Sequence, residues 1–187
     1  IPPTESPDYN ALVTIYNSTN GDTWTNNTNW LNTTKPISTW FGITETNGRV
    51  TGINLTNNNV IGSIPSELTD LTELEVFWIQ GANLSGEIPS SIGDLTKLRQ
   101  LILFQTNGLT GNIPTSLQNC TNLEWALLSY NQLEGNIPDL TGLNNLTDFY
   151  IDNNKFQFGD FENEFASYQT KIGSNFVYAP QKTHSLK

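Results

Sequence analysis

The sequence predicts an α/β solenoid, a stack of similar coils in which each coil contributes one short strand to a shared sheet. The first observation is a fixed period: an apolar pattern of the form Leu-x-x-Leu-x-Leu-x-x-Asn recurs at intervals of 24, 24, 25 and 23 residues. Its copies start at Val50, Leu74, Leu98, Leu123 and Leu146. The second observation is that the first four copies end in the string Gly-x-Ile-Pro. A period in this range indicates a solenoid, because a unit of this size cannot bury its apolar side alone.

The composition excludes several classes of partner. The 187 residues carry a net charge of -10, and only 14% of them are charged. A chain this acidic repels nucleic acid and anionic membrane surfaces, since both attract clustered Lys and Arg. No segment is long and apolar enough to enter a bilayer. We therefore expect no nucleic acid partner, no membrane insertion and no cofactor, and we expect a monomer.

The compartment is indicated by what the chain lacks. The single cysteine, Cys120, excludes an internal disulfide and would by itself suit the cytosol. The chain begins at Ile1 and contains no Met, which favours a mature product whose signal peptide has been removed. We therefore expect a secreted, extracellular or cell-surface protein in which Cys120 is a buried structural thiol.

Residues 1–49 are expected to form an N-terminal cap. Ser6-Pro7-Asp8 predicts a helix start, with Ser at the N-cap and Pro at the first helical position. Asn20-Gly21 predicts its end. Trp24, Trp30 and Trp40 follow in a polar loop, and we expect them to cover the open end of the first repeat.

Residues 50–159 are expected to form five repeats. The apolar positions of each copy point inward, as Val50, Ile53 and Leu55 do in the first, and each strand pairs in parallel with the next. An inward Asn follows each strand and can satisfy buried backbone groups of the turn. We assign that role to Asn58, Asn107, Asn131 and Asn154. The second repeat has Ala82 in this place, and the third has one extra residue within 104–108.

Residues 160–180 are expected to form a C-terminal cap. Phe161, Phe165, Tyr168 and Ile172 have helical spacing, and Gly173 is a stop. The segment 176–178 then predicts a closing strand. We expect residues 181–187 to be a tail.

The segments 50–65, 74–89 and 123–138 closely resemble the plant-type leucine-rich repeat, L-x-x-L-x-L-x-x-N-x-L-x-G-x-I-P. The resemblance covers residues 50–158. It implies a right-handed leucine-rich repeat superhelix with a concave parallel β-sheet and a second small strand from the Gly-x-Ile-Pro portion. The helical caps at both ends are expected from the cap segments described above. It also implies a role in recognition, as in the ectodomains of plant receptor kinases.

The N-terminal cap departs from the plant pattern, since it has no paired cysteines. Trp24, Asn29-Trp30 and the run Trp40-Phe41-Gly42-Ile43 are instead similar to the cap of secreted leucine-rich repeat proteins of Bacteroidetes-type bacteria and some algae. The resemblance therefore leaves a bacterial or algal module as an expectation beside a plant one.

The outward strand positions predict a binding surface. Trp78, Ile102, Leu127 and Tyr150 fall in one column across the repeats, with Phe104, Trp125 and Tyr130 beside them. Outward aromatic side chains on strands rarely serve the core, and exposed stripes of this kind mark binding surfaces. Packing of the side chains against each other, or under a cap, would also explain the column. Trp and Tyr suit protein hot spots and sugar stacking alike.

Charged residues complete the candidate ligand-binding surface. Glu75, Arg99 and Glu124 share a column, while Asp148 and Asp152 lie outward on the last strand. The first three form a ladder of alternating charge. As a catalytic carboxylate pair, Glu75 and Glu124 would be on the order of 10 Å apart, and Arg99 between them would keep both ionised. The only histidine, His184, lies in the tail, so we expect neither catalysis nor a metal site.

These observations predict a non-catalytic recognition module that binds a protein partner on the concave face. Two alternatives stay open. One is a polysaccharide-binding module of a larger secreted protein, and the other is a structural or adhesion spacer.

Overall fold

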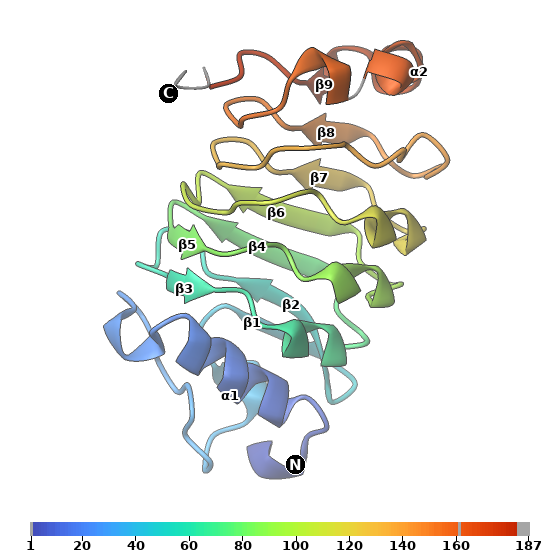
Figure 1. Cartoon of the computed structure of the whole chain (residues 1–187). Coiled ribbons are helices and arrows are strands. Elements are labelled where there is room, and N and C mark those ends of the chain that lie inside the picture. The colour runs from blue at the N-terminus through green and yellow to red at the C-terminus, as the bar shows by residue number, and fades with distance from the viewer. Residues whose placement is uncertain (1, 161, 183–187) are drawn as a thin grey trace.

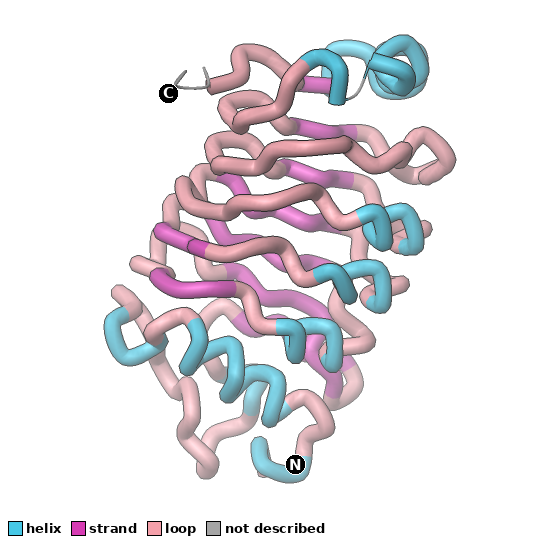
Figure 2. Tube along the Cα trace, viewed as in Figure 1, coloured by secondary structure: helices cyan, strands magenta, loops and turns pink. Residues whose placement is uncertain are grey.

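The computed structural model describes residues 2–160 and 162–182. The chain climbs in coils from its N-terminus to its C-terminus, with strands along one side of each coil and short 3-10 turns along another (Figures 1 and 2). In the described residues one sheet has seven strands, in the order β1-β2-β4-β6-β7-β8-β9. The strands are β1 (Ile43–Thr46), β2 (Arg49–Asn54), β4 (Val76–Gln80), β6 (Gln100–Phe104), β7 (Trp125–Leu127), β8 (Asp148–Tyr150) and β9 (Phe176–Val177).

From β2 to β9 all neighbours pair in parallel, as the repeat pattern predicts. β1 was not predicted. It pairs antiparallel with β2 through the turn Asn47-Gly48, where both residues have positive φ (52° and 78°). Asn-Gly is the residue pair that a two-residue hairpin with this backbone prefers. The signal for β1 was therefore present in the sequence.

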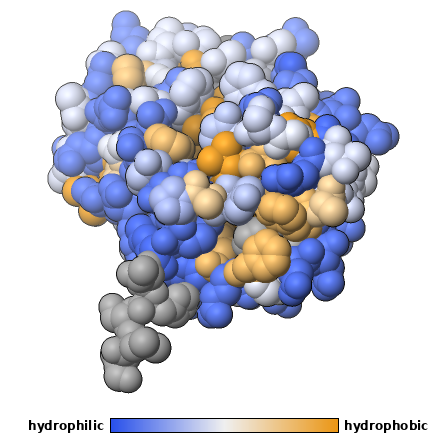
Figure 3. Space-filling view, turned by 90° about the horizontal axis from the view of Figure 1, so that it is seen from above, coloured by the Kyte–Doolittle hydropathy of each residue, from blue (hydrophilic) through white to orange (hydrophobic). Residues whose placement is uncertain are grey.

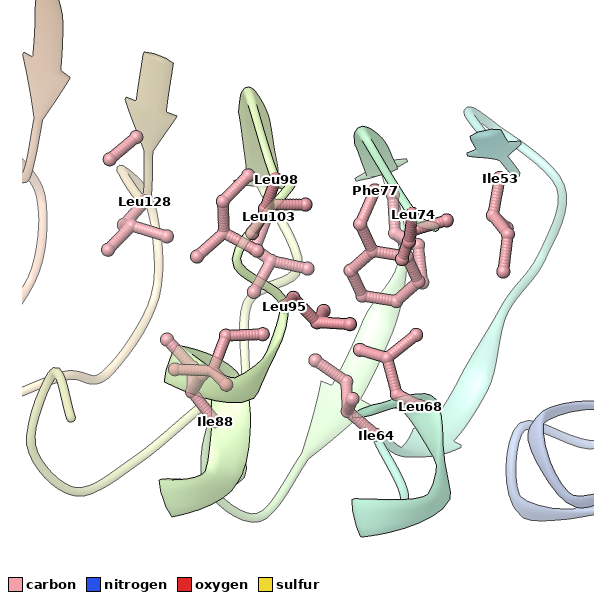
Figure 4. Close-up of a cluster of buried hydrophobic side chains, with 14 of the residues drawn as sticks. Ile53, Ile64, Leu68, Leu74, Phe77, Ile88, Leu95, Leu98, Leu103 and Leu128 are labelled. Carbon is pink, nitrogen blue, oxygen red and sulfur yellow. The ribbon is translucent and has the colours of Figure 1, made fainter. Parts of the chain in front are cut away.

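The core lies between the sheet and three stacked 3-10 turns. These turns, η4 (Ser66–Asp70), η5 (Ser90–Asp94) and η6 (Thr115–Asn119), each begin directly after the proline of a Gly-x-Ile-Pro string. Proline fixes φ and has no N–H to satisfy, so it suits the residue before a tight turn. Figure 4 shows the result: Phe77 of β4 and Leu103 of β6, with Leu74 just before β4, point toward Leu68 of η4 and Leu95 at the end of η5.

The second small sheet is shorter than the repeat pattern implies. Within the part of the chain that the structure describes, only β3 (Ile61–Ser63) and β5 (Asn83–Ser85) pair as strands in it, and the next repeat adds a single bridge between Glu87 and Thr110. The extra residue of the third repeat lies within 107–108, shortly before Thr110.

The polar ladder is confirmed at three of its four positions. The amides of Asn58, Asn131 and Asn154 are buried and hydrogen-bonded to backbone groups. Asn107 was wrongly placed: it is exposed, and Thr106 occupies the buried position, with its hydroxyl 2.5 Å from Asn131 Oδ1. The one extra residue lies within 107–108, after the ladder position rather than before it, so the inward residue is one earlier than expected.

At the N-terminal end, α1 (Tyr9–Ser18) begins later than Ser6. The Ser6 hydroxyl accepts the N–H of Asp8 at 3.3 Å, but the helix starts only after Asp8. The side chain of Asp8 is instead bonded to β2. Its buried carboxylate receives Arg49 at 2.8 Å and the N–H of Val50 at 2.7 Å, which joins this end of α1 to β2.

The tryptophans of the N-terminal part are buried. Trp24, Trp30 and Trp40 pack with Tyr16 and Tyr9 in one aromatic cluster, with ring centroids 4.9–6.1 Å apart. Each indole N–H donates to a backbone carbonyl. These three side chains therefore belong to the core.

At the C-terminal end, α2 (Glu162–Ile172) lies beside β9. Tyr168 is its one fully buried residue, and the Tyr168 hydroxyl donates to the carbonyl of Pro138 and accepts the N–H of Leu140. Phe161, which was expected on the same apolar face of the helix as Tyr168, lies outside the described residues. Viewed from this end, apolar atoms gather over α2 and β9 (Figure 3), and Phe158 nearby is 54% exposed.

The expected tail is shorter than residues 181–187. The Gln181 side chain bonds to the backbone of Asn154 and Ile151, at 3.1 and 3.0 Å. Lys182 donates from its backbone to Asn154 and from its ammonium to the carbonyl of Asn131, each at 2.6 Å. These two residues therefore close the last repeat. Residues 183–187 lie outside the described part.

Candidate binding surface on the sheet

The outward side of the seven-stranded sheet, here called the sheet face, carries the predicted column of apolar residues. The strand register aligns Asn54, Trp78, Ile102, Leu127 and Tyr150 on successive strands. Parallel strands are about 4.8 Å apart, so consecutive side chains in the column touch or nearly touch. The column therefore forms one continuous strip across five strands.

The members of this strip differ in exposure. Trp78, Leu127 and Tyr150 are partly exposed, whereas Ile102 is only 2% exposed. Ile102 lies between Trp78 and Leu127 in the register, and large side chains on both sides cover it. The expectation that Ile102 offers contact area is therefore wrong, although it supports the two residues that do.

A second aromatic group lies at the carboxyl ends of the strands. Phe104 ends β6, and its ring packs edge-on against Tyr130 with centroids 5.4 Å apart. Tyr130 is 38% exposed, one of the most exposed large apolar side chains in the described residues. Trp125 lies at the other end of its strand, in register with Gln100 and Asp148.

Tyr130 has a backbone conformation that few tyrosines adopt. Its φ is 61°, in the left-handed region. The residues at the same place in the other repeats are also left-handed; they are Asn57, Gly81, Gln105 and Asn153. Asn and Gly accept this conformation readily, whereas a residue such as Tyr does so at a cost of about 1 kcal/mol. The fold imposes the conformation, and the sequence places an exposed aromatic ring there nevertheless.

The charged column forms the expected ladder. Arg99 pairs closely with Glu124, at 2.9 Å from its Nη2, and more distantly with Glu75, at 3.8 Å from Nη1. All three side chains are substantially exposed, so each pair is worth at most about 1 kcal/mol. The ladder leaves the Glu75 carboxylate less fully paired than that of Glu124.

The two aspartates of the site lie in different surroundings. Asp148 is partly exposed beside Trp125, and it accepts the Thr147 hydroxyl at 2.7 Å. Asp152 is only 8% exposed, and its carboxylate accepts the Ser129 hydroxyl and the Asn153 amide. Asp152 therefore acts in the fold, by binding the neighbouring repeat, and is a poor candidate for direct contact with a ligand.

The structure offers little reactive chemistry. In residues 2–160 and 162–182 no three His, Cys, Asp or Glu side chains come together as a metal site requires. Cys120 is buried and donates weakly to the carbonyl of Ile92 at 3.4 Å. Burial, with a smaller effect of Asp94, raises the pKa of its thiol to about 12, so it is a poor nucleophile. Neither helix of the described part has the length and apolarity to cross a membrane.

Comparison with solved structures identifies the family. No protein-family model and no curated protein matches the chain. The crystal structure of a pollen receptor kinase 3 superimposes with a TM-score of 0.65 at 30% identity, covering 78% of this chain and 71% of its own. The chain is a plant-type leucine-rich repeat protein.

Two further solved structures are similar over part of their own length. The plant peptide hormone receptor RGFR1 in complex with RGF2 is 43% identical over 53% of this chain, with a TM-score of 0.51, and the match spans 16% of that receptor. A plant ice-binding protein is 27% identical with a TM-score of 0.71, over 80% of this chain and 49% of its own. The N-terminal resemblance to bacterial or algal modules stays a prediction.

Proposed function

We propose that this leucine-rich repeat chain is a non-catalytic recognition module, secreted or at the cell surface, that binds a protein or peptide through its sheet face. The observation that carries the proposal is the group of partly exposed aromatic side chains on that face, which are Trp78, Phe104, Trp125, Tyr130 and Tyr150. Buried tryptophan and tyrosine anchors dominate the binding energy of protein interfaces. In a right-handed superhelix this face is the concave one, where a ligand contacts several repeats at once.

The structural neighbours support a protein or peptide as the partner. RGFR1 is a peptide hormone receptor, and its structure is a complex with RGF2. The net charge of -10 and the carboxylates of Glu75, Glu124 and Asp148 on the face favour a basic partner, because complementary charge steers association. The left-handed backbone of Tyr130 supports a functional role for this face, since strained residues concentrate at functional sites.

The proposal is tested by an array of secreted protein fragments and synthetic peptides, with a glycan array beside it. Proteins retained by the wild type should be lost with Trp78→Ala/Trp125→Ala and kept with Ile61→Ala, which removes a partly exposed side chain from β3, away from the sheet face (Figure 1). Retention by the double variant would contradict the proposal. Binding only to glycans would favour the polysaccharide alternative.

A second candidate is binding to ice, because one of the similar structures is a plant ice-binding protein. The observation in its favour is a column of exposed threonines at one repeat position, which are Thr72, Thr96 and Thr121. A periodic column of hydroxyls suits a periodic ligand surface. Inhibition of ice growth by the wild type, reduced in Thr96→Val, would support this candidate, and growth at the rate seen with a non-binding protein would exclude it.

A further inference from the structure

A hollow lies at the N-terminal end of the sheet face. Its volume is about 240 Å³, and its lining includes Thr44, Gly52, Glu75 and Val76. It exists because Gly52 has no side chain, whereas the next strands carry Val76, Gln100, Trp125 and Asp148 at the same register position. The sheet face is therefore level across four strands and indented at the first repeat.

The hairpin that precedes the repeats makes the far wall of this hollow. β1 pairs with β2 so that Thr44 lies opposite Gly52, and a Cβ added at Gly52 would come 3.1 Å from the Cβ of Thr44. The near wall is made by Val76 of β4 and by Glu75, the residue before that strand. The hollow is thus bounded by paired strands on both sides, and the pairing of β1 with β2 shifts register just after Thr44.

The chemistry of the lining is mixed and acidic. Val76 provides apolar surface, Thr44 and Thr51 provide hydroxyls, and Glu75 provides the one charged group. Arg99 Nη1 is 3.8 Å from the Glu75 carboxylate. The Nε and Nη2 atoms of Arg99 instead bond to the Glu124 carboxylate, at 2.9–3.2 Å. Glu75 is 44% exposed and keeps acceptor sites for another cation.

We propose that this hollow is a pocket for an arginine side chain of the protein partner; this rests on the proposed function and specifies its partner. The arginine stem packs on Val76, and its guanidinium bonds to Glu75 and to the hydroxyls beside it. A guanidinium has five donors in a fixed fork, which suits separate acceptors, and it is weakly hydrated. Since Asn54 lines the hollow and lies in register with Trp78, apolar residues next to that arginine reach the aromatic strip.

The test uses a small probe, so that no partner need be known. N-acetyl-arginine-N-methylamide is titrated into the ¹⁵N-labelled chain, and N-acetyl-citrulline-N-methylamide serves as its uncharged match. We expect shifts at the amides of Gly52, Asn54 and Val76 with the arginine probe, and about tenfold weaker binding of the citrulline probe.

Three variants locate the binding. Glu75→Gln should weaken the arginine probe about tenfold, and Gly52→Val should abolish its shifts by filling the hollow. Glu134→Gln, the same change at an exposed glutamate outside the strands of the sheet, should have no effect. Circular dichroism of each variant confirms that it is folded. Equal binding of both probes, or unchanged binding to Glu75→Gln, would overturn the proposal.

Different results would contradict the arginine pocket and the proposed function. A protein partner that is lost with Trp78→Ala/Trp125→Ala but bound equally by Glu75→Gln would leave the sheet face as the binding surface and exclude the arginine pocket. Probe binding at Gly52 in a chain that retains no protein on the array would support the pocket and contradict the proposed function.

Discussion

At the scale of single residues, the sheet face shows where fold and function make different demands. In each repeat one residue of the turn that follows the strand is left-handed, and three of the five repeats have Asn or Gly there. Tyr130 instead places a bulky side chain there, and its ring packs edge-on against Phe104 at the surface. A residue selected for stability alone would be Asn.

Replacing Tyr130 separates these demands. Tyr130→Asn relieves the left-handed strain and loses an exposed ring contact, two effects of about 1 kcal/mol each, so we expect little net change in the free energy of unfolding. Tyr130→Ala loses the ring and keeps the strain, and we expect it to be about 1 kcal/mol less stable than Tyr130→Asn. Urea denaturation measures both. Equal stability of the two variants would show that the backbone conformation at residue 130 carries no cost.

Cys120 makes a prediction about pH. Burial holds its thiol pKa at about 12, whereas a thiol in an unfolded chain titrates near 8.5, at roughly its ordinary value. Between these values only the unfolded state loses the proton, so this contribution to stability is complete below about pH 8.5 and is lost as the pH rises toward 12. The free energy of unfolding should therefore fall more steeply above pH 9 in the wild type than in Cys120→Ala, by about 1 kcal/mol per pH unit. Parallel slopes in guanidinium titrations at pH 8–10.5 would contradict this.

Single residues were also where the sequence was least informative about the site. Ile102 and Trp78 are both outward in the period-two pattern, yet one is covered and the other is not. Asp152 follows the same pattern and is closed off by Ser129. Exposure on a face depends on the sizes of neighbours on adjacent strands, which a pattern along one strand does not contain.

At the scale of elements, the joint between α1 and β2 depends on one buried carboxylate. Asp8 accepts two bonds from Arg49 Nε and Nη2 and one from the Val50 N–H. Asp8→Ala should lower the free energy of unfolding by about 3 kcal/mol, because it leaves a buried N–H and an arginine without their acceptor. Arg49→Ala should cost a similar amount, because it leaves the buried Asp8 carboxylate without its counter-charge. A loss under about 1 kcal/mol in Asp8→Ala would show that the joint does not hold the N-terminal part to the repeats.

The polar ladder makes a second prediction at this scale. The Asn131 amide donates to the carbonyls of Leu103 and Leu128, at 2.7 and 3.2 Å, in the dry interior. Asn131→Ala should cost about 2–3 kcal/mol, since those carbonyls and Thr106 lose their partner. The exposed Asn107 serves as the matched control, and Asn107→Ala should cost less than about 1 kcal/mol. Thermal unfolding of the two variants compares them, and equal losses would contradict the assignment of Thr106 to the ladder.

The strands that recur with the repeat period were predictable from the sequence, whereas the strand that depends on a hairpin turn was missed. The strands β2, β4, β6, β7 and β8 follow from the repeat. β1 did not, although Asn47-Gly48 marked its turn, because the pattern of tryptophans before it indicated only packing. That omission also hid the hollow at Gly52, since its far wall is β1.

At the scale of the whole molecule, stacking converts a local pattern into a surface. Each repeat contributes one or two outward side chains, and parallel register brings those of five strands into one strip. The period therefore predicted both the architecture and the surface on which binding residues would lie. It did not predict the ends, where Gln181 and Lys182 close the last repeat through bonds that no repeat position encodes.

The central claim is that the aromatic side chains of the sheet face serve a partner and not the fold, and the Trp78→Ala/Trp125→Ala variant tests it most directly. Its affinity for an array-selected partner and its free energy of unfolding are measured together, with Trp40→Ala as the control for a core tryptophan. We predict at least about a hundredfold loss of affinity, with a stability change below about 1.5 kcal/mol, against about 3–5 kcal/mol for Trp40→Ala. Unchanged affinity, or a stability loss as large as that of Trp40→Ala, would contradict the claim.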